Sequence, residues 1–303
     1  MKRRRQIGSL EVSIIGLGGN NFGWRVDAAG TADVVEAALD EGINFFDTAD
    51  MYGGTKSEDF LGRALGRRRD EAVIATKFGW EIDASRRGAH PDYVRRAVDD
   101  SLKRLGTDRI DLYQLHKPDP AVPIRDTLGA LADIVRAGKV REIGCSNFSA
   151  AQLREAEAAA SDGVRFVSVQ NEYNLLHRDP ETDVLPECRR LGIAFIPYYP
   201  LASGLLTGKY RQGQPIPKGT RLTDRRPTED RLGEIEALVA FAESRGHTLL
   251  ELAFGWLTTN PQVASVIAGA TSPAQVQHNA ASAGWELTPD ELAEVDRILQ
   301  PQH

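Results

Sequence analysis

Cysteine is scarce in this chain of 303 residues, which contains only Cys145 and Cys188. The two lie 43 positions apart and no second pair exists, so the sequence offers no disulfide framework. Cys145 falls in an expected strand and Cys188 in an expected helix, which predicts two reduced thiols in the core. We therefore expect a reducing, cytoplasmic location.

Long apolar runs, a basic excess and metal-binding motifs are also missing. No apolar run approaches the roughly 20 residues that span a bilayer, and none follows the basic residues 2–5, so we expect no membrane partner and no secretion signal. The formal net charge of −6 argues against a nucleic-acid partner, because no basic excess is present to neutralise phosphates. Asp47, Asp50 and His116 leave a metal site conceivable, but no ligand pair has metal-binding spacing, so we predict none.

A Gly-x-Gly-x-x-Gly fingerprint between the first strand and helix is likewise absent, which argues against a doubly wound dinucleotide fold. The chain instead repeats a cycle of a short, mostly apolar strand followed by a helix. The strands are expected at residues 14–19, 43–46, 72–76, 110–115, 141–145, 166–169, 193–196 and 263–267. Eight such cycles predict an α/β fold of the (β/α)8 TIM-barrel type, with residues 1–303 as a single domain.

Three additions to the eight cycles are expected. A short N-terminal β-hairpin is predicted around Gly8-Ser9, within residues 6–15. Extra helices fill the C-terminal third, where helical segments are expected at 229–244 and 249–258 and at the chain end. Capping boxes are predicted at the helix starts Ser149/Gln152, Ser272/Gln275 and Thr288/Glu291. Residues 200–228 form a long excursion, which in a compact domain is usually functional.

Polar side chains follow the expected strands at the end where the chemistry of such barrels gathers. The second strand is followed by Asp47 and Tyr52, the third by Lys77 and the fourth by His116. The later strand ends add further polar and aromatic residues, namely Ser146, Asn147, Gln170, Asn171 and Tyr198. Taken singly, each could be structural: an ion pair, a core histidine or a packing aromatic. Together they predict an active site on an apolar barrel.

The first four residues have an acid–base logic. A Lys77 ammonium near Tyr52 would favour the phenolate and lower the pKa of the phenol, and Asp47 would keep the lysine charged. His116 could donate or relay a proton, or hydrogen-bond a substrate oxygen. A general acid beside a carbonyl, with no nucleophile, indicates carbonyl reduction by hydride transfer from a nicotinamide cofactor. A Schiff-base aldolase using Lys77 is an alternative, although the pairing with Asp47 argues against a neutral amine.

Seven ordered segments carry a family resemblance over nearly the full length: residues 42–53, 74–77, 108–116, 138–147, 170–174, 198–209 and 266–270. On these segments the chain resembles the aldo-keto reductases. The resemblance implies a catalytic tetrad of Asp47, Tyr52, Lys77 and His116, with Tyr52 as the proton donor. It also implies an NAD(P)H cofactor, an oxidoreductase activity on a small carbonyl or alcohol substrate, and a less favoured alternative as a cofactor-binding regulatory subunit of the same fold.

The resemblance further implies a cofactor site. The nicotinamide carboxamide would be held by Ser146, Asn147 and Gln170, and Tyr198 would stack on the nicotinamide ring. The pyrophosphate would lie under a loop that includes Leu201, Ser203, Gly204, Leu205 and Lys209. The adenosine phosphate would lie at the helix start after the last strand, where free N–H groups favour an anion, near Gly269, Thr271, Ser272, Gln275 and Asn279.

NADPH is the default cofactor by this resemblance, with NADH possible. Gly269 and Gln275 stand where the family often has cations for the 2′-phosphate, and His278 replaces a common acidic residue. Our hypothesis is that the chain binds both cofactors, or takes a cation from the following loop through Lys209, Lys218 or Arg221. An aromatic, apolar substrate pocket is expected from Phe22, Trp24, Met51 and Trp80. The physiological substrate, the direction of the reaction and the oligomeric state stay open.

Overall fold

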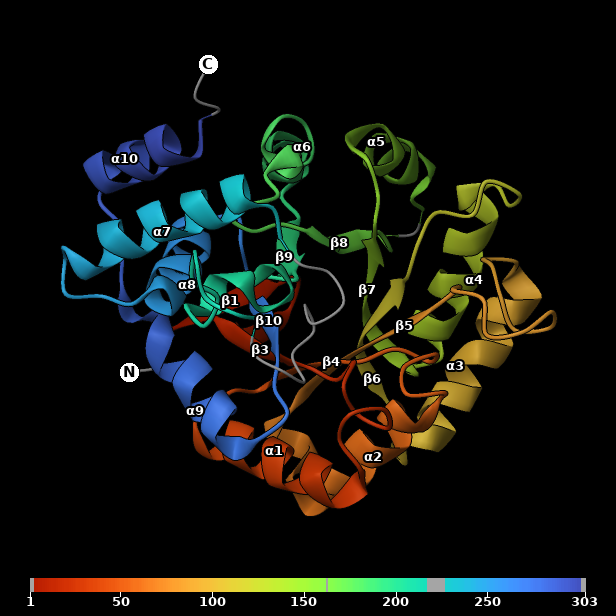
Figure 1. Ribbon diagram of the computed structural model, residues 1–303. Coiled ribbons are helices and arrows are strands. Elements are labelled where there is room, and N and C mark those ends of the chain that lie inside the picture. Colours follow the sequence, from red (N-terminus) through yellow and green to blue (C-terminus); the bar gives the residue numbers. More distant parts are fainter. Residues whose placement is uncertain (1–2, 162, 217–226, 301–303) are drawn as a thin grey trace.

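A computed structural model describes residues 3–161, 163–216 and 227–300 of the chain. Eight parallel strands form one sheet in the order β10-β3-β4-β5-β6-β7-β8-β9. They are β3 (Ile15–Gly18), β4 (Phe45–Asp47), β5 (Val73–Phe78), β6 (Ile110–Leu115), β7 (Val140–Ser146), β8 (Phe166–Glu172), β9 (Ala194–Tyr198) and β10 (Val266–Gly269). The predicted (β/α)8 barrel is confirmed (Figure 1).

The barrel closes between β9 and β10 through residues that precede β10. The N–H of Phe195 donates to the carbonyl of Gln262 at 3.0 Å, and the N–H of Ala264 donates to the carbonyl of Phe195 at 2.9 Å. The predicted start of the last strand, at residue 263, is therefore wrong. Val263 forms an isolated bridge to Phe195, and the ladder with β3 begins only at Val266.

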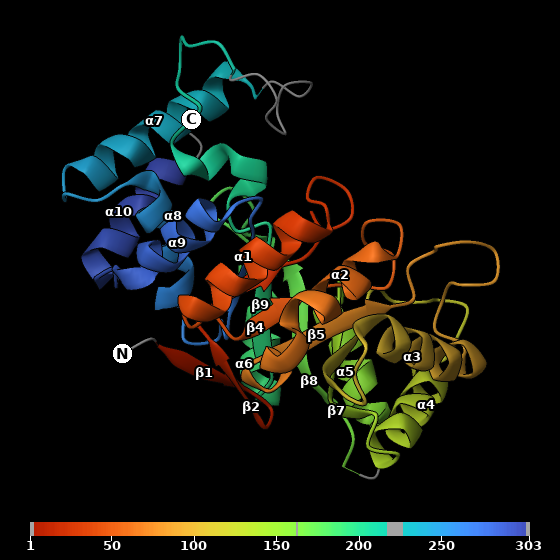
Figure 2. The ribbon, with the colours of Figure 1, turned by 90° about the horizontal axis from the view of Figure 1, so that it is seen from below.

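The predicted N-terminal hairpin is confirmed, although it begins earlier than expected. Strand β1 (Arg4–Ile7) pairs antiparallel with β2 (Leu10–Ser13) around the Gly8-Ser9 turn. Figure 2 shows the hairpin at one end of the barrel, with the loops after β3, β4 and β5 at the other. Its apolar side chains close the lower interior by packing with residues such as Phe45 and Ile196.

Helices surround the sheet, as Figure 1 shows. The ring consists of α1 (Ala28–Asp40), α2 (Lys56–Leu65), α3 (Pro91–Leu105), α4 (Ile124–Arg136), α5 (Ala150–Ala159), α6 (Val184–Leu191), α8 (Leu249–Thr259) and α9 (Pro273–Ala281). Helix α7 (Glu229–Glu243) packs on α8 and on α10 (Pro289–Leu299), which confirms the extra helices in the C-terminal third. Short 3-10 helices are η1 (Gly66–Glu71), η2 (Asp179–Glu181), η3 (Ala202–Thr207) and η4 (Ser282–Gly284).

Two of the three predicted capping boxes are complete, those at Ser149 and Thr288. The third prediction is half wrong. The Ser272 hydroxyl accepts from the N–H of Gln275, but the Gln275 side chain accepts from the N–H of Thr271 at 2.9 Å instead of returning to Ser272. The glutamine therefore braces the turn before α9 rather than its cap.

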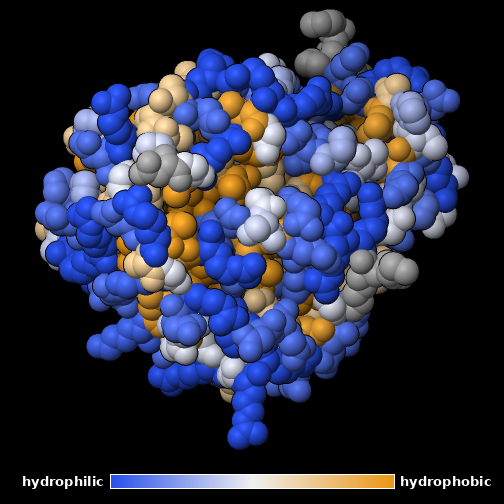
Figure 3. All heavy atoms as spheres, turned by 180° about the vertical axis from the view of Figure 1, so that it is seen from behind, coloured by the Kyte–Doolittle hydropathy of each residue, from blue (hydrophilic) through white to orange (hydrophobic). Residues whose placement is uncertain are grey.

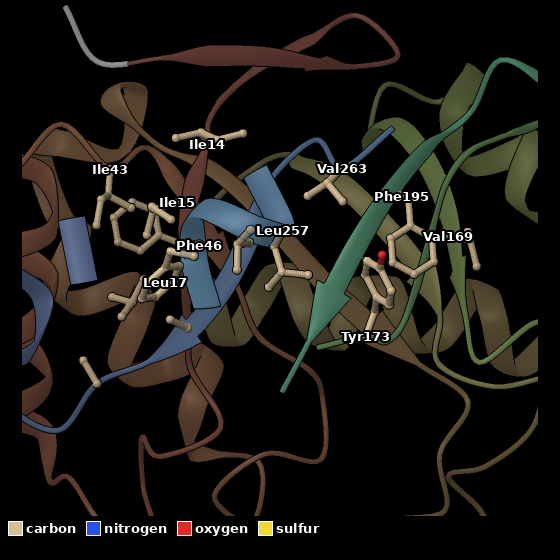
Figure 4. Packing of buried hydrophobic residues seen from close by; sticks show 14 of the residues in the cluster. Ile14, Ile15, Leu17, Ile43, Phe46, Val169, Tyr173, Phe195, Leu257 and Val263 are labelled. Atoms are coloured by element: carbon tan, nitrogen blue, oxygen red, sulfur yellow. The ribbon is translucent and has the colours of Figure 1, made fainter. Parts of the chain in front are cut away.

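The core has two layers because strand side chains alternate between the two faces of the sheet. Phe45 points into the barrel, whereas Phe46 packs outside it under the helices. Figure 4 shows Ile15 and Leu17 gathered with Phe46, and Phe195 with Val169. Seen from behind, the surface is mainly hydrophilic, with hydrophobic atoms mostly in recesses (Figure 3). No helix in the described ranges is both long enough and apolar enough to cross a membrane.

Candidate active site

A cavity of about 920 Å³ opens at the C-terminal ends of the strands. Its wall includes most of the residues that the sequence singled out, namely Asp47, Met51, Tyr52, Trp80, His116, Ser146, Asn147, Gln170, Tyr198, Leu201, Ser203, Gly204, Lys209, Gly269, Thr271, Gln275 and Asn279. The wall does not include Phe22, Trp24, Lys77, Leu205 or Ser272. Phe22 is buried in the main core, and Trp24 is 66% exposed outside the cavity.

Strand alternation explains why the polar residues converge. Residues two apart face the same side of a strand, so Asp47 continues the interior row of Phe45, and Lys77 that of Ala75. The interior is apolar at the level of the hairpin and becomes polar toward the strand ends. His116 comes just after β6, and the same alternation places it on the interior side, where it is 7% exposed.

Asp47, Lys77 and Tyr52 form the floor of the cavity. The Lys77 ammonium, which is fully buried, donates to Asp47 Oδ2 at 2.6 Å and to the carbonyl of Thr48 at 2.8 Å. Its Nζ lies 5.1 Å from the centre of the Tyr52 ring. The Tyr52 and His116 rings meet edge-on, with centroids 5.8 Å apart.

The turn after β4 returns Tyr52 to the floor. Gly53 and Gly54 have positive φ angles of 59° and 64°, a conformation that glycine adopts without steric cost. At Gly53 a Cβ atom would also lie 2.1 Å from the carbonyl oxygen of Phe22. The turn can therefore close against the loop after β3 only with glycine at this position.

The floor of the cavity combines one charged group, the Lys77 ammonium, with two neutral groups, the Tyr52 phenol and the His116 imidazole. Burial lowers the pKa of Lys77, but the charge and hydrogen bonds of Asp47 and Tyr52 together outweigh it, and the net shift is upward. Burial also raises the pKa of the Tyr52 phenol, more than the Lys77 ammonium lowers it. The expected lowering of the Tyr52 pKa by Lys77 is present, but burial outweighs it. The phenol therefore carries its proton at neutral pH.

His116 is a neutral imidazole. Burial first, and then the Lys77 and Lys117 ammonium groups, lower the pKa of His116 to about 2. Its Nδ1 atom is buried with no hydrogen-bond partner among the described residues. A neutral imidazole can donate a hydrogen bond through one nitrogen but cannot act as an imidazolium acid. Trp80 packs beside it, with ring centroids 5.2 Å apart.

The nicotinamide side of the predicted cofactor site is tied together by its own hydrogen bonds. Asn147, with a positive φ of 61°, donates to the carbonyl of His116 at 2.9 Å. The Tyr198 hydroxyl donates to Asn147 Oδ1 at 2.9 Å, and the Ser146 hydroxyl donates to the carbonyl of Gln170 at 2.7 Å. Asn171, by contrast, donates to the carbonyl of Phe148, so its amide is engaged in the loop that leads to α5.

The segment after β9 adopts a strained backbone beside the cavity. Tyr199, Ala202 and Ser203 have positive φ angles of 52°, 45° and 59°. Such strain tends to gather at functional sites. The long loop predicted over residues 200–228 begins with the short 3-10 helix η3. At and just before the start of this helix, Leu201, Ser203 and Gly204 lie on the cavity wall. Leu205 instead packs against the core.

The adenosine side is formed where the loop after β3 meets the turn before α9. A Cβ atom on Gly269 would lie 3.1 Å from Asn21 Nδ2 and 3.3 Å from Asn20 Oδ1, so the absence of a side chain lets the two loops approach. This loop also brings Arg25 to the cavity wall, with its guanidinium 4.5 Å from the centre of the Trp24 ring. Lys209 lies on the wall as well, whereas Lys218 and Arg221 fall outside the described residues.

Sequence reasoning missed four polar residues of the site: Asn20, Asn21, Arg25 and Gln114. The glycine run before Asn20 indicated a close backbone approach, and it could have directed attention to the loop. Gln114 lies two positions before His116, and strand alternation places it on the same face. In the described ranges no cluster of three or more His, Cys, Asp or Glu side chains could hold a metal ion.

Comparisons with known proteins agree with this geometry. A family model described as "Aldo/keto reductase family" matches residues 14–300. "Aldo-keto reductase YhdN" of Bacillus subtilis (strain 168) is 34% identical, with 96% of this chain and 91% of the relative covered. A "Probable voltage-gated potassium channel subunit beta" of Arabidopsis thaliana is 35% identical, with 96% and 94% covered.

Solved structures show the same likeness. The glycerol dehydrogenase AKR11B4 from Gluconobacter oxydans superimposes with a TM-score of 0.86 at 32% identity, and the alignment covers 98% of this chain and 94% of that one. The aldo-keto reductase AKR11C1 from Bacillus halodurans, in its holo form, gives a TM-score of 0.83 at 31% identity, with 98% and 96% covered.

Proposed function

The chain belongs to the aldo/keto reductase family and is an oxidoreductase, and from this premise we propose that it transfers a hydride reversibly between NADPH and a small aldehyde or ketone. The observation that carries the proposal is the floor of the cavity. There a protonated Tyr52 phenol lies beside a charged Lys77, which Asp47 holds at 2.6 Å, and beside a neutral His116. These groups arrive on three consecutive strands, β4, β5 and β6.

Each residue has a distinct role in the proposal. Tyr52 gives its proton to the carbonyl oxygen of the substrate, and the Lys77 ammonium stabilises the phenolate that this leaves. His116, being neutral, donates a hydrogen bond to the same oxygen and orients it. A bound nicotinamide cofactor supplies the hydride. For oxidation of an alcohol the same groups act in reverse, with the Tyr52 phenolate as the base.

The cavity wall fits a dinucleotide. Its volume of about 920 Å³ lies within the range of about 300–1,000 Å³ that ligand pockets occupy. Ser146, Asn147 and Gln170 would hold the carboxamide, and the Tyr198 ring would cover the nicotinamide. Arg25 and Lys209 stand on the wall, and within the described ranges neither has a carboxylate partner, which suits cofactor phosphates.

Replacing Tyr52 by phenylalanine tests the proton-donor role. General acid catalysis contributes about 10²–10⁴-fold, so we expect kcat for an aromatic aldehyde to fall by that factor in the Tyr52→Phe variant. The Kd for NADPH, measured by quenching of tryptophan fluorescence, should stay nearly unchanged. A variant that retains full kcat on a substrate for which chemistry limits the rate contradicts the assignment.

Cofactor preference is tested at the two cations of the wall. We expect Arg25→Met and Lys209→Met each to raise the Kd for NADPH by about 10- to 150-fold, the range of charged hydrogen bonds, and to reduce its dependence on salt. NADH binding should suffer less if either cation pairs the 2′-phosphate. Equal affinities of the wild-type chain for NADPH and NADH, with the same salt dependence, exclude such a pairing.

A second candidate is a cofactor-binding regulatory subunit, with which the Arabidopsis relative's name is consistent. Turnover of an aromatic aldehyde with NADPH separates a regulatory subunit from an enzyme, and a panel of substrates that includes glycerol would begin to define the substrate.

A Schiff-base aldolase is disfavoured because the pKa of Lys77 is raised, and borohydride trapping of a substrate on Lys77 would revive this alternative. We also propose that the chain is a single domain. We propose a cytoplasmic location as well, since Cys145 and Cys188 are free and buried thiols.

A further inference from the structure

Gln114 on β6 is fully buried inside the barrel and bonds to the floor of the site rather than to the backbone. Its Nε2 donates to Asp47 Oδ1 at 3.3 Å. The Gln170 amide donates to the same oxygen at 2.8 Å, and lies 3.4 Å from Gln114 Oε1. Asp47 therefore receives Lys77 on one carboxylate oxygen and two amides on the other.

The intervening strand is shaped to let the two amides meet. Gly144 on β7 pairs in register with Gln114. A Cβ atom there would lie 3.3 Å from Gln114 Cγ and 2.6 Å from the Ser168 hydroxyl. Because β7 presents no side chain at this level, Gln114 on β6 reaches across it to Gln170 on β8.

These bonds determine which end of the Gln170 amide faces the cavity. The amide nitrogen of Gln170 has two hydrogens, of which one points toward Asp47 and the other toward Gln114. Gln170 lines the cavity wall, so its carbonyl oxygen is the end of the amide that is left to accept from a ligand. Without Gln114, the Gln170 amide would lose one of the two partners that distinguish its nitrogen from its oxygen.

We propose that Gln114 is a positioning residue of the reductase, which fixes the Asp47 carboxylate and holds the Gln170 carbonyl oxygen toward an amide N–H of the ligand. The ligand group is the carboxamide of a nicotinamide, so this role rests on the proposed function. Gln114 acts through Asp47 and Gln170 and does not touch the reacting atoms. It links the proton-donating floor to the cofactor wall.

Three variants test this role: Gln114→Leu, which removes the amide, Gln114→Glu, and the control Ser168→Ala. The Ser168 hydroxyl lies at the same level of the barrel but has no hydrogen-bond partner among the described residues. A glutamate at 114 still donates to Asp47 when protonated, but repels it when ionised. We therefore expect Gln114→Glu to approach wild-type kcat/KM at pH 6 and to lose about tenfold by pH 9, with Gln114→Leu impaired by about tenfold throughout.

The cofactor arm uses NADP and its 3-acetylpyridine analogue, in which a methyl group replaces the amide nitrogen. We expect the wild-type chain to bind NADP about tenfold more tightly than the analogue, and Gln114→Leu to narrow this ratio to under about threefold. Ser168→Ala should keep the wild-type ratio and pH profile. If Gln114→Leu does not fold, the pH profile of kcat/KM and the binding ratio of NADP to its analogue, both measured on Gln114→Glu, test the role instead.

A pH profile and a binding ratio that are both unchanged in folded Gln114 variants overturn the role of Gln114. An inactive wild-type chain that still binds NADP overturns the proposed reductase instead. In that case the binding ratio still decides whether Gln114 orients the Gln170 amide.

Discussion

At the scale of single residues, Asp50 shows how burial decides what a carboxyl group does. It lies three residues after Asp47, the last residue of β4, but it is 2% exposed and faces away from the cavity, where it accepts from the Tyr93 hydroxyl at 3.3 Å. Its other oxygen has no hydrogen-bond partner among the described residues. Burial first, and then the neighbouring Glu58 carboxylate, raise the pKa of Asp50 to about 7.

This raised pKa makes stability depend on pH. Between about pH 4 and 7 the folded chain holds a proton that the unfolded chain releases, so the contribution of Asp50 is present at low pH and is lost as the pH rises through 7. Asp50→Asn removes the penalty of the buried charge, which is at most roughly 4 kcal/mol. We expect its Tm to exceed that of the wild type at pH 8 and the difference to vanish near pH 4.

Thermal unfolding at five pH values, with exposed Asp108→Asn as the control, measures this effect. A difference in Tm that is the same at all pH values, or largest in acid, contradicts the assignment.

At the scale of elements, one close contact fixes α2 against the end of α3. A Cβ atom on Gly62, in the middle of α2, would lie 2.1 Å from the carbonyl oxygen of Leu105, the last residue of α3. Since the atom it would meet belongs to the backbone, a larger residue requires one helix to move. A Cβ atom on Gly129, in the middle of α4, would have no described atom within 4 Å apart from the backbone of its own helix and its chain neighbours.

The two glycines make a matched pair of alanine substitutions. We expect Gly62→Ala to lower the free energy of unfolding by about 1–3 kcal/mol through overpacking. Gly129→Ala should raise it by up to about 1 kcal/mol, because alanine has the better helix propensity. Urea denaturation followed by circular dichroism measures both. Equal effects of the same sign at the two positions would show that helix propensity, rather than the contact, dominates.

At the scale of the whole molecule, the N-terminal hairpin fastens the seam of the barrel. The Arg5 guanidinium on β1 donates to the carbonyls of Thr258 and Asn260, each at 2.7 Å, and also to the carbonyl of Val263. Thr258 lies in the last turn of α8, and Asn260 and Val263 lie between α8 and β10, next to the residues that bond to Phe195 on β9. One side chain near the start of the chain therefore braces the point where the two ends of the sheet meet.

Arg5→Met keeps the apolar stem and removes the three donors. We expect the free energy of unfolding to fall by about 2–4 kcal/mol, because buried carbonyls lose their partners. The control Arg4→Met removes only a surface pair with Glu11 at 3.6 Å, and should cost less than about 1 kcal/mol. Equal losses in the two variants would assign the effect to the hairpin in general rather than to the seam.

Local sequence patterns were enough to predict the order of the elements and the polar residues at the strand ends. Local signals suffice for this: short apolar runs, glycine stops, and capping residues act over a few neighbours. Because parallel barrel strands end on one face, the polar residues after them had to converge, and Asp47, Tyr52, Lys77 and His116 followed from that rule.

Tertiary structure decided what each group does once gathered. The neutral state of His116 and the raised pKa values of Tyr52 and Asp50 depend on burial, which a local pattern does not report. The bonds of Gln114 to Asp47 and Gln170 join positions 67 and 56 residues apart, and Arg5 reaches carbonyls more than 250 residues away. Such contacts exist only after the sheet has closed, because their atoms belong to residues that are far apart in the chain and meet only in the folded barrel.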